Sequence, residues 1–135
     1  MSSPSRPRPE FRNIHVSQIV SYRLPPAGIV SILHRISGVV MFLLLPFVIW
    51  MFDTSISSEA SFDAFTAVFH SGWVKLVTLV LIWAYLHHFI AGVRHLYMDA
   101  THSVSKEFGK SSAIVTLALG VVLTLALGSK LFGLY

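Results

Sequence analysis

Several ionisable side chains lie within apolar stretches of this chain, where they are costly unless they face a partner or a ligand. One group is Ser31, His34 and Arg35, in the run SILHRISG. On a helix these residues, three and four apart, lie close together on one side. A hydroxyl, an imidazole and a guanidinium can together hydrogen-bond a carbonyl oxygen or bind a carboxylate. We expect a ligand site here; the alternative is that Arg35 simply extends to the lipid headgroups.

A second group lies in the run HHFIAGVRH and consists of His87, His88, Arg94 and His95. His88 is eleven residues, or about 16 Å of helix, from Asp99, where the apolar stretch ends. It is therefore expected near the middle of a membrane. Ala84 and Gly92, four residues to either side, leave room on its face for a flat, bulky group.

An imidazole at that depth can supply one axial ligand to a haem iron, and an electron-transfer haem takes two. On a helix His87 points about 100° away from His88, and His95 lies roughly 10 Å further along. Neither histidine can supply the second axial ligand to the iron that His88 binds, so we expect that ligand from another chain. Basic side chains near the same end would neutralise the haem propionates: His34, Arg35, Arg94 and His95. The alternative is that His88 hydrogen-bonds a neighbouring helix.

The composition indicates the elements that carry these residues. Of the 135 residues 54% are hydrophobic and 12% charged, against about 25% charged in ordinary soluble domains. This excludes a disordered chain, a coiled coil and a typical soluble enzyme. We predict an all-α integral membrane fold, a single membrane-anchor domain over 1–135. Its parts are a polar arm, 1–26, and three transmembrane helices, 27–52, 72–98 and 112–134.

The distribution of basic residues predicts the orientation of these spans. Eight of the ten Lys and Arg lie at one end of the spans: Arg6, Arg8, Arg12, Arg23, Arg35, Arg94, Lys106 and Lys110. We expect the N-terminal arm and the 99–111 connection to be cytoplasmic. The acidic 53–71 connection and the C-terminus are expected to be periplasmic. This placement explains the net charge of +4 without nucleic acid, and no nucleotide-binding fingerprint is present.

The third predicted span carries a stripe of small residues. They recur every four positions and are Ser112, Thr116, Gly120, Thr124 and Gly128. In lipid such a stripe lets helices approach closely, so we expect this face to contact another helix. A connection at 53–71 with a short helix near 62–69 completes the predicted elements.

The two polar runs resemble, in order and separation, the cytochrome b556 membrane-anchor family of succinate dehydrogenase (complex II). The first is the run from Ser31 to Gly38, and the second runs from His88 through Gly92 to Asp99. The resemblance implies a two-chain haem-binding anchor bundle that holds a flavoprotein and an iron–sulfur subunit on the cytoplasmic face. It also implies that electrons from succinate pass through FAD and iron–sulfur clusters in those partners to ubiquinone. One haem b would lie between the anchors, with an axial histidine from each.

The resemblance also implies roles for individual residues. His88 would be the haem ligand in this chain, since its spacing to Gly92 matches the family and that of the extra histidine, His87, does not. Ser31 and Arg35 match quinone-pocket residues, and His34 matches a residue near the haem propionates. No residue for succinate oxidation is expected, because the chain has neither a flavin fingerprint nor the cysteines that ligate clusters.

Two other functions remain open at this stage. The chain could anchor a fumarate reductase or another quinone-linked cytochrome b. It could instead be a small structural or transport-associated membrane protein whose polar clusters pair between helices. We expect the bacterial inner membrane, surrounded by membrane lipids, because no transit peptide precedes the first motif.

Overall fold

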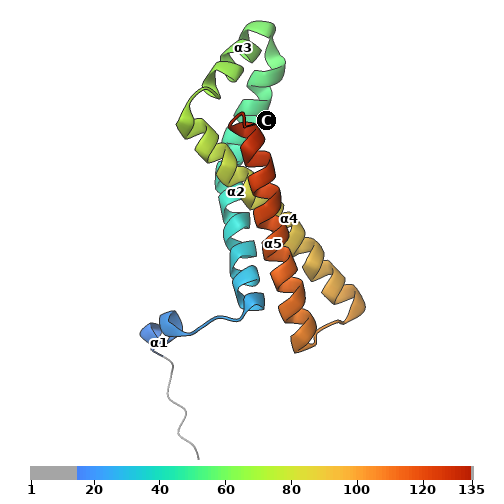
Figure 1. Cartoon of the computed structure of the whole chain (residues 1–135). Helices are drawn as coiled ribbons and strands as arrows, with labels where there is room; N and C mark the ends of the chain where they lie inside the picture. The colour runs from blue at the N-terminus through green and yellow to red at the C-terminus, as the bar shows by residue number, and fades with distance from the viewer. Residues whose placement is uncertain (1–14, 135) are drawn as a thin grey trace, which may run out of the picture.

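The structure, a computed structural model, describes residues 15–134, and all regular elements in this part of the chain are helices (Figure 1). Its elements are α1 (Val16–Ser21), α2 (Pro26–Ser57), α3 (Glu59–Val68), α4 (Gly72–Thr101) and α5 (Lys106–Leu131). Within the described residues, α2, α4 and α5 are long and apolar enough to cross a membrane. The predicted all-α fold with three membrane-spanning helices is therefore confirmed. Most of the predicted N-terminal arm, residues 1–14, lies outside the described residues.

The three long helices form one elongated bundle (Figure 1). α2 packs against α4 and α5, and α4 packs against α5. The short helix α3 joins α2 to α4 at one end of the bundle, where α5 also ends. The opposite end carries α1, the start of α2 and the connection between α4 and α5. These are called the α3 end and the α1 end below.

Local hydrogen bonds explain why the helices end at other residues than hydropathy predicted. The first long helix continues past 52 to Ser57, and the hydroxyls of Ser55 and Ser57 donate back to backbone carbonyls one turn earlier. Ser58 then caps α3, because its hydroxyl accepts the N–H of Ser61. Likewise Ser105 caps α5 and begins that helix at Lys106, well before 112. Capping serines and the residues next to them are polar, so a prediction from hydropathy alone makes these helices too short.

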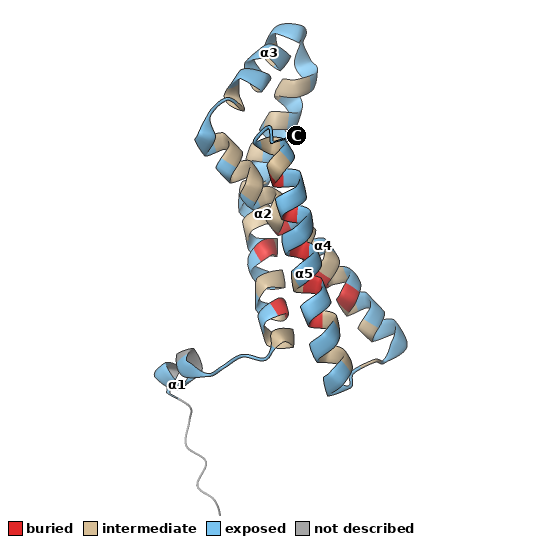
Figure 2. Ribbon diagram, in the orientation of Figure 1, coloured by how far each residue is buried: buried red, intermediate tan, exposed pale blue. Residues whose placement is uncertain are grey.

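The buried residues lie where the three long helices face one another (Figure 2), and most of them are small, whereas many large apolar residues are exposed. The fully buried hydrophobic residues in the described part are Val30, Ala84, Ala91 and Ala113. By contrast, 74% of Phe42 and 67% of Leu125 is exposed. Exposed apolar side chains of this size suit helices whose outer surface faces lipid, where burial against protein carries no hydrophobic advantage.

The small-residue stripe of α5 lies against the rest of the bundle, as predicted. Thr116, Gly120, Thr124 and Gly128 are all buried. A Cβ on Gly128 would lie 2.8 Å from Cδ1 of Leu79 in α4, so the two helices touch there. The hydroxyls of Thr116 and Thr124 donate to carbonyls one turn earlier in α5, which leaves neither hydroxyl unpaired inside the bundle.

Arg94 ties α4 to the first turns of α5. Its side chain is only 8% exposed. Nε donates to the hydroxyl of Ser112 at 2.9 Å, and Nη2 donates to the carbonyl of Gly109 at 3.2 Å. A buried guanidinium needs such partners, because an unpaired donor away from water is expensive. Ser112, the first member of the stripe, is therefore a hydrogen-bond partner rather than only a small packing residue.

We expect Ser112→Ala to lower the free energy of unfolding by about 1–3 kcal/mol, the cost of leaving a buried charged donor without its acceptor. The neighbouring Ser111→Ala is the matched control, since Ser111 is exposed and its hydroxyl binds only carbonyls of its own helix. Denaturation of the two purified variants in detergent micelles measures the difference. Equal stability of the two variants would show that the Arg94–Ser112 bond contributes nothing.

Candidate functional site

Three histidines, one from α2 and two from α4, gather between these helices. The ring of His34 stacks on that of His88, with centroids 4.0 Å apart and planes inclined by 15°. The ring of His95 lies 5.3 Å from His34 at a tilt of 54°. All three side chains are partly buried. Two of the predicted clusters, far apart in sequence, therefore meet at one place in the fold.

Hydrogen bonds to one ring nitrogen assign the tautomer of His88. Its Nδ1 lies 3.0 Å from the backbone carbonyl of His34 and 3.3 Å from the hydroxyl of Ser37. The Ser37 hydroxyl itself donates to the same carbonyl at 2.9 Å. A carbonyl can only accept, so Nδ1 of His88 carries the proton. The lone pair is then on Nε2, the arrangement found in histidines that bind a metal through Nε2.

A glycine makes room for this ring. A Cβ on Gly38 would lie 3.1 Å from Cε1 and 3.4 Å from Nδ1 of His88. The contact at Gly92 is less tight, since a Cβ there would lie 3.6 Å from Nε2 of His34, an ordinary van der Waals distance. From the sequence, Gly38 was recognised only as the end of the first motif, and no role was predicted for Ser37. Their positions, three and four residues after His34, are the signal that could have pointed to both.

His87 lies on a different face of α4 from His88. Its side chain is 1% exposed and stacks on Trp83, with ring centroids 5.7 Å apart. Gly120 of α5 approaches its ring, because a Cβ there would lie 3.6 Å from Nδ1. Within the described residues Nε2 of His87 has no hydrogen-bond partner. This histidine is enclosed by the bundle, so it is not available to a bulky group outside the three helices.

The structure brings together some of the remaining predicted residues and separates others. Ser31 is partly buried and Arg35 exposed, and no hydrogen bond joins their side chains to that of His34 in the described chain. Arg94 does not join the histidine cluster, since it lies with His87 on the buried face of α4 and binds α5. Its predicted contact with a haem propionate stays a prediction.

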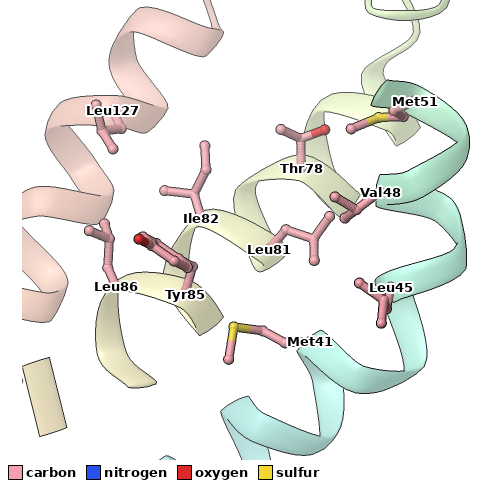
Figure 3. Close-up of a pocket in the computed structure, with 10 residues that line it drawn as sticks. All are labelled: Met41, Leu45, Val48, Met51, Thr78, Leu81, Ile82, Tyr85, Leu86 and Leu127. Atoms are coloured by element: carbon pink, nitrogen blue, oxygen red, sulfur yellow. The ribbon is translucent and has the colours of Figure 1, made fainter. Parts of the chain in front are cut away.

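An apolar cleft of about 510 Å³ lies between α2 and α4 (Figure 3). Met41 lies one turn beyond Ser37 on α2, and Tyr85 one turn before His88 on α4. The side chains of α2 and α4 face each other across it. Sequence reasoning missed this cleft, which is lined by Met41, Leu45, Val48, Met51, Thr78, Leu81, Ile82, Tyr85, Leu86 and Leu127.

No group of three or more His, Asp or Glu side chains within residues 15–134 could hold a metal ion by itself. The cluster instead presents one oriented imidazole beside an apolar cleft, with basic side chains toward the α1 end. Such a site suits a flat cofactor that brings most of its own ligands to the metal.

The sequence matches the family model described as succinate dehydrogenase/fumarate reductase transmembrane subunit over residues 8–127. The chain belongs to this family. Curated relatives include the succinate dehydrogenase cytochrome b556 subunit of Coxiella burnetii, 34% identical over 105 residues, which are 77% of this chain and 84% of that protein. The subunit of the same name from Paracoccus denitrificans is 33% identical over 103 residues, 76% and 78% of the two chains.

A third relative, the cytochrome b560 subunit of Reclinomonas americana, is 29% identical over 123 residues, 84% of this chain and 85% of the relative. The predicted resemblance to cytochrome b556 anchors is confirmed, and with it the prediction of a membrane cytochrome b subunit of succinate dehydrogenase. Membership of this family makes the oriented His88 the first residue to test.

We expect Gly38→Ala to displace the His88 ring and lower stability by about 1–3 kcal/mol, the usual cost of overpacking a tight contact. Gly72→Ala is the control, because nothing lies within 4 Å of a Cβ at that position. Thermal unfolding in detergent compares the two. A Gly38→Ala variant as stable as Gly72→Ala would mean that the ring has room to move.

Proposed function

We propose that this chain binds one haem b through Nε2 of His88 and shares it with a second membrane-anchor subunit, which supplies the other axial ligand. The main support for this proposal is the hydrogen bond from Nδ1 of His88 to the carbonyl of His34. It leaves Nε2 as the free ligand atom and prevents the ring from turning. The cytochrome b names of the relatives agree with this assignment. When bound, the haem supplies a one-electron redox centre.

The residues around His88 fit such a group. The cleft that begins at Met41 and Tyr85 offers an apolar surface beside the ligand, suited to the apolar edge of a porphyrin. The propionates would face the α1 end, where His34, His95 and Arg35 can donate to them. Arg94, the fourth residue predicted for this role, already uses two donors on α5.

We further propose that the α1 end of α2 contributes to a site where ubiquinone is reduced. Ser31 supplies a hydroxyl that can donate to a quinone carbonyl. Arg35 supplies a fixed positive charge that stabilises negative charge developing on the quinone oxygens. Arginine keeps its proton, so the protons taken up on reduction come from water at this end.

The electrons would come from subunits outside this chain. An FAD-containing flavoprotein oxidises succinate, and an iron–sulfur subunit passes the electrons on to ubiquinone. We place both on the cytoplasmic face of a bacterial inner membrane, at the α1 end, because the basic residues of the chain concentrate there. The N-terminus is then cytoplasmic and the C-terminus periplasmic.

We expect His88→Ala to abolish or strongly reduce the b-type bands in the dithionite-reduced minus oxidised spectrum of membranes containing the complex. His70→Ala, an exposed histidine near the α3 end, is expected to leave the bands unchanged. His87→Gln should also retain them, because His87 is buried away from the ligand face. Normal bands in His88→Ala, or their loss in His87→Gln alone, would reject the ligand assignment.

We expect Ser31→Ala and Arg35→Ala each to slow ubiquinone reduction about tenfold or more, the effect of losing one hydrogen bond or charge at a reacting oxygen. Succinate oxidation with an artificial dye should survive, because that step belongs to the partner subunits. Ile32→Ala, on the exposed face of the same turn, is the control. Unchanged ubiquinone turnover in both variants would exclude this site from quinone reduction.

A further inference from the structure

A second pocket, separate from the histidine site, lies at the α1 end between three helices. It has a volume of about 390 Å³ and is bounded by the start of α2, the last turns of α4 and the start of α5. Its polar lining includes Arg94, Lys106 and Lys110, and none of its lining residues is an aspartate or a glutamate. Arg94 reaches it from the buried face of α4, whereas His88 and His95 lie on another face.

Within residues 15–134, no carboxylate lines this pocket or forms an ion pair with its three basic side chains. Arg94 is 8% exposed, and its two hydrogen bonds go to neutral acceptors, the Ser112 hydroxyl and the Gly109 carbonyl. A guanidinium has five N–H donors, so others remain for a ligand. Lys106 and Lys110 are exposed and one helical turn apart, which places both ammonium groups on one side of α5. A buried cation is stable when an anion with good hydrogen-bond geometry accompanies it.

The start of α5 adds to the attraction for an anion. Ser105 caps the helix by accepting the N–H of Phe108, and its carbonyl accepts the N–H of Gly109. The backbone N–H groups of Lys106 and Glu107 precede these and have no acceptor within the helix. They carry the partial positive charge of the helix N-terminus, and Ser105 and Lys106, where this helix begins, line the same pocket.

The remaining walls of the pocket indicate that this anion belongs to a lipid. Apart from Ser105 and Gly109 they are apolar and consist of Pro25, Pro26, Ala27, Met98 and Val104. The pocket also lies where three membrane-spanning helices begin or end, at the level of the headgroups. A soluble phosphate would gain nothing from apolar walls, whereas the glycerol and first acyl carbons of a lipid would be covered by them.

We propose that this pocket binds the phosphate of an anionic phospholipid. Arg94 and the two lysines neutralise the phosphate, and the apolar wall holds the glycerol end of the molecule. Basic pockets between membrane helices on the cytoplasmic side recognise anionic headgroups through this combination of charge and position. Bound lipid would link the start of α2 to α4 and α5, close to the face on which we place the partner subunits.

The test uses the intact complex in nanodiscs of pure phosphatidylcholine and in nanodiscs with phosphatidylglycerol at about one lipid in five. We expect phosphatidylglycerol to raise the Tm of the wild type and to be retained in native mass spectra. In the Lys106→Gln/Lys110→Gln variant retention should weaken about 25-fold, because each lysine near the surface contributes roughly fivefold. The Tm increase should be lost with it.

A matched control removes the same charge at the other end of the bundle. Lys75→Gln/Lys130→Gln should bind phosphatidylglycerol like the wild type, because neither lysine lines the pocket. Inorganic phosphate added to phosphatidylcholine discs should not reproduce the Tm increase. If it does, and phosphatidylglycerol adds nothing, the site is one for free phosphate.

Two further results would overturn the proposal. Equal lipid retention by both double variants would show that general surface charge is responsible. Loss of partner subunits from the Lys106→Gln/Lys110→Gln variant, with no effect of lipid on the wild type, would show that a carboxylate of a partner chain is the anion. Neither result bears on the haem, whose b-type bands should be the same in all these variants.

Discussion

A single hydrogen bond, from Nδ1 of His88 to the backbone carbonyl of His34, connects the packing of this protein with its chemistry. It joins α2 to α4 inside the bundle, where an unpaired imidazole or carbonyl would be costly. It also decides which nitrogen of His88 keeps a lone pair. The stacked ring of His34 and the missing side chain at Gly38 hold the imidazole in this orientation. The residue that we propose as the haem ligand is therefore held in one orientation.

The helix α4 carries two pairs of polar residues on two different faces. His87 and Arg94, seven residues apart, lie with Ala84 and Ala91 on the buried face. His88 and His95, also seven apart, lie beside His34 at the opening toward α2. The buried face holds the helices together, and the other face carries the histidines of the haem site that we propose. Adjacent histidines therefore have different environments, although the sequence presents them as a pair.

The two ends of the bundle also differ in polarity. The α3 end contains an apolar cleft between α2 and α4 with few polar groups. Toward the α1 end, α2 carries Ser31, His34 and Arg35, and the basic pocket lies at the start of α5. The haem and ubiquinone sites that we propose need both environments, an apolar one for the cofactor and the quinone tail and a charged one for the reacting oxygens.

The sequence by itself determined the class of fold, the three spans and the family. Hydropathy is a property of each segment, and the two motifs carry their residue types in fixed order. The stripe on α5 was also readable, because its period is that of a helix. The ends of the helices were placed less well, since capping serines such as Ser58 and Ser105 have no hydropathy signal.

Only the tertiary structure decided which polar groups meet. The acceptor for His88 is a backbone carbonyl, and backbone groups are the same in every residue, so no sequence pattern reveals that pairing. The partner of Arg94 is likewise decided by how close α5 lies, and that distance depends on small residues contributed by several helices. Spacing along one helix tells which side chains share a face; it does not tell which neighbour that face will contact.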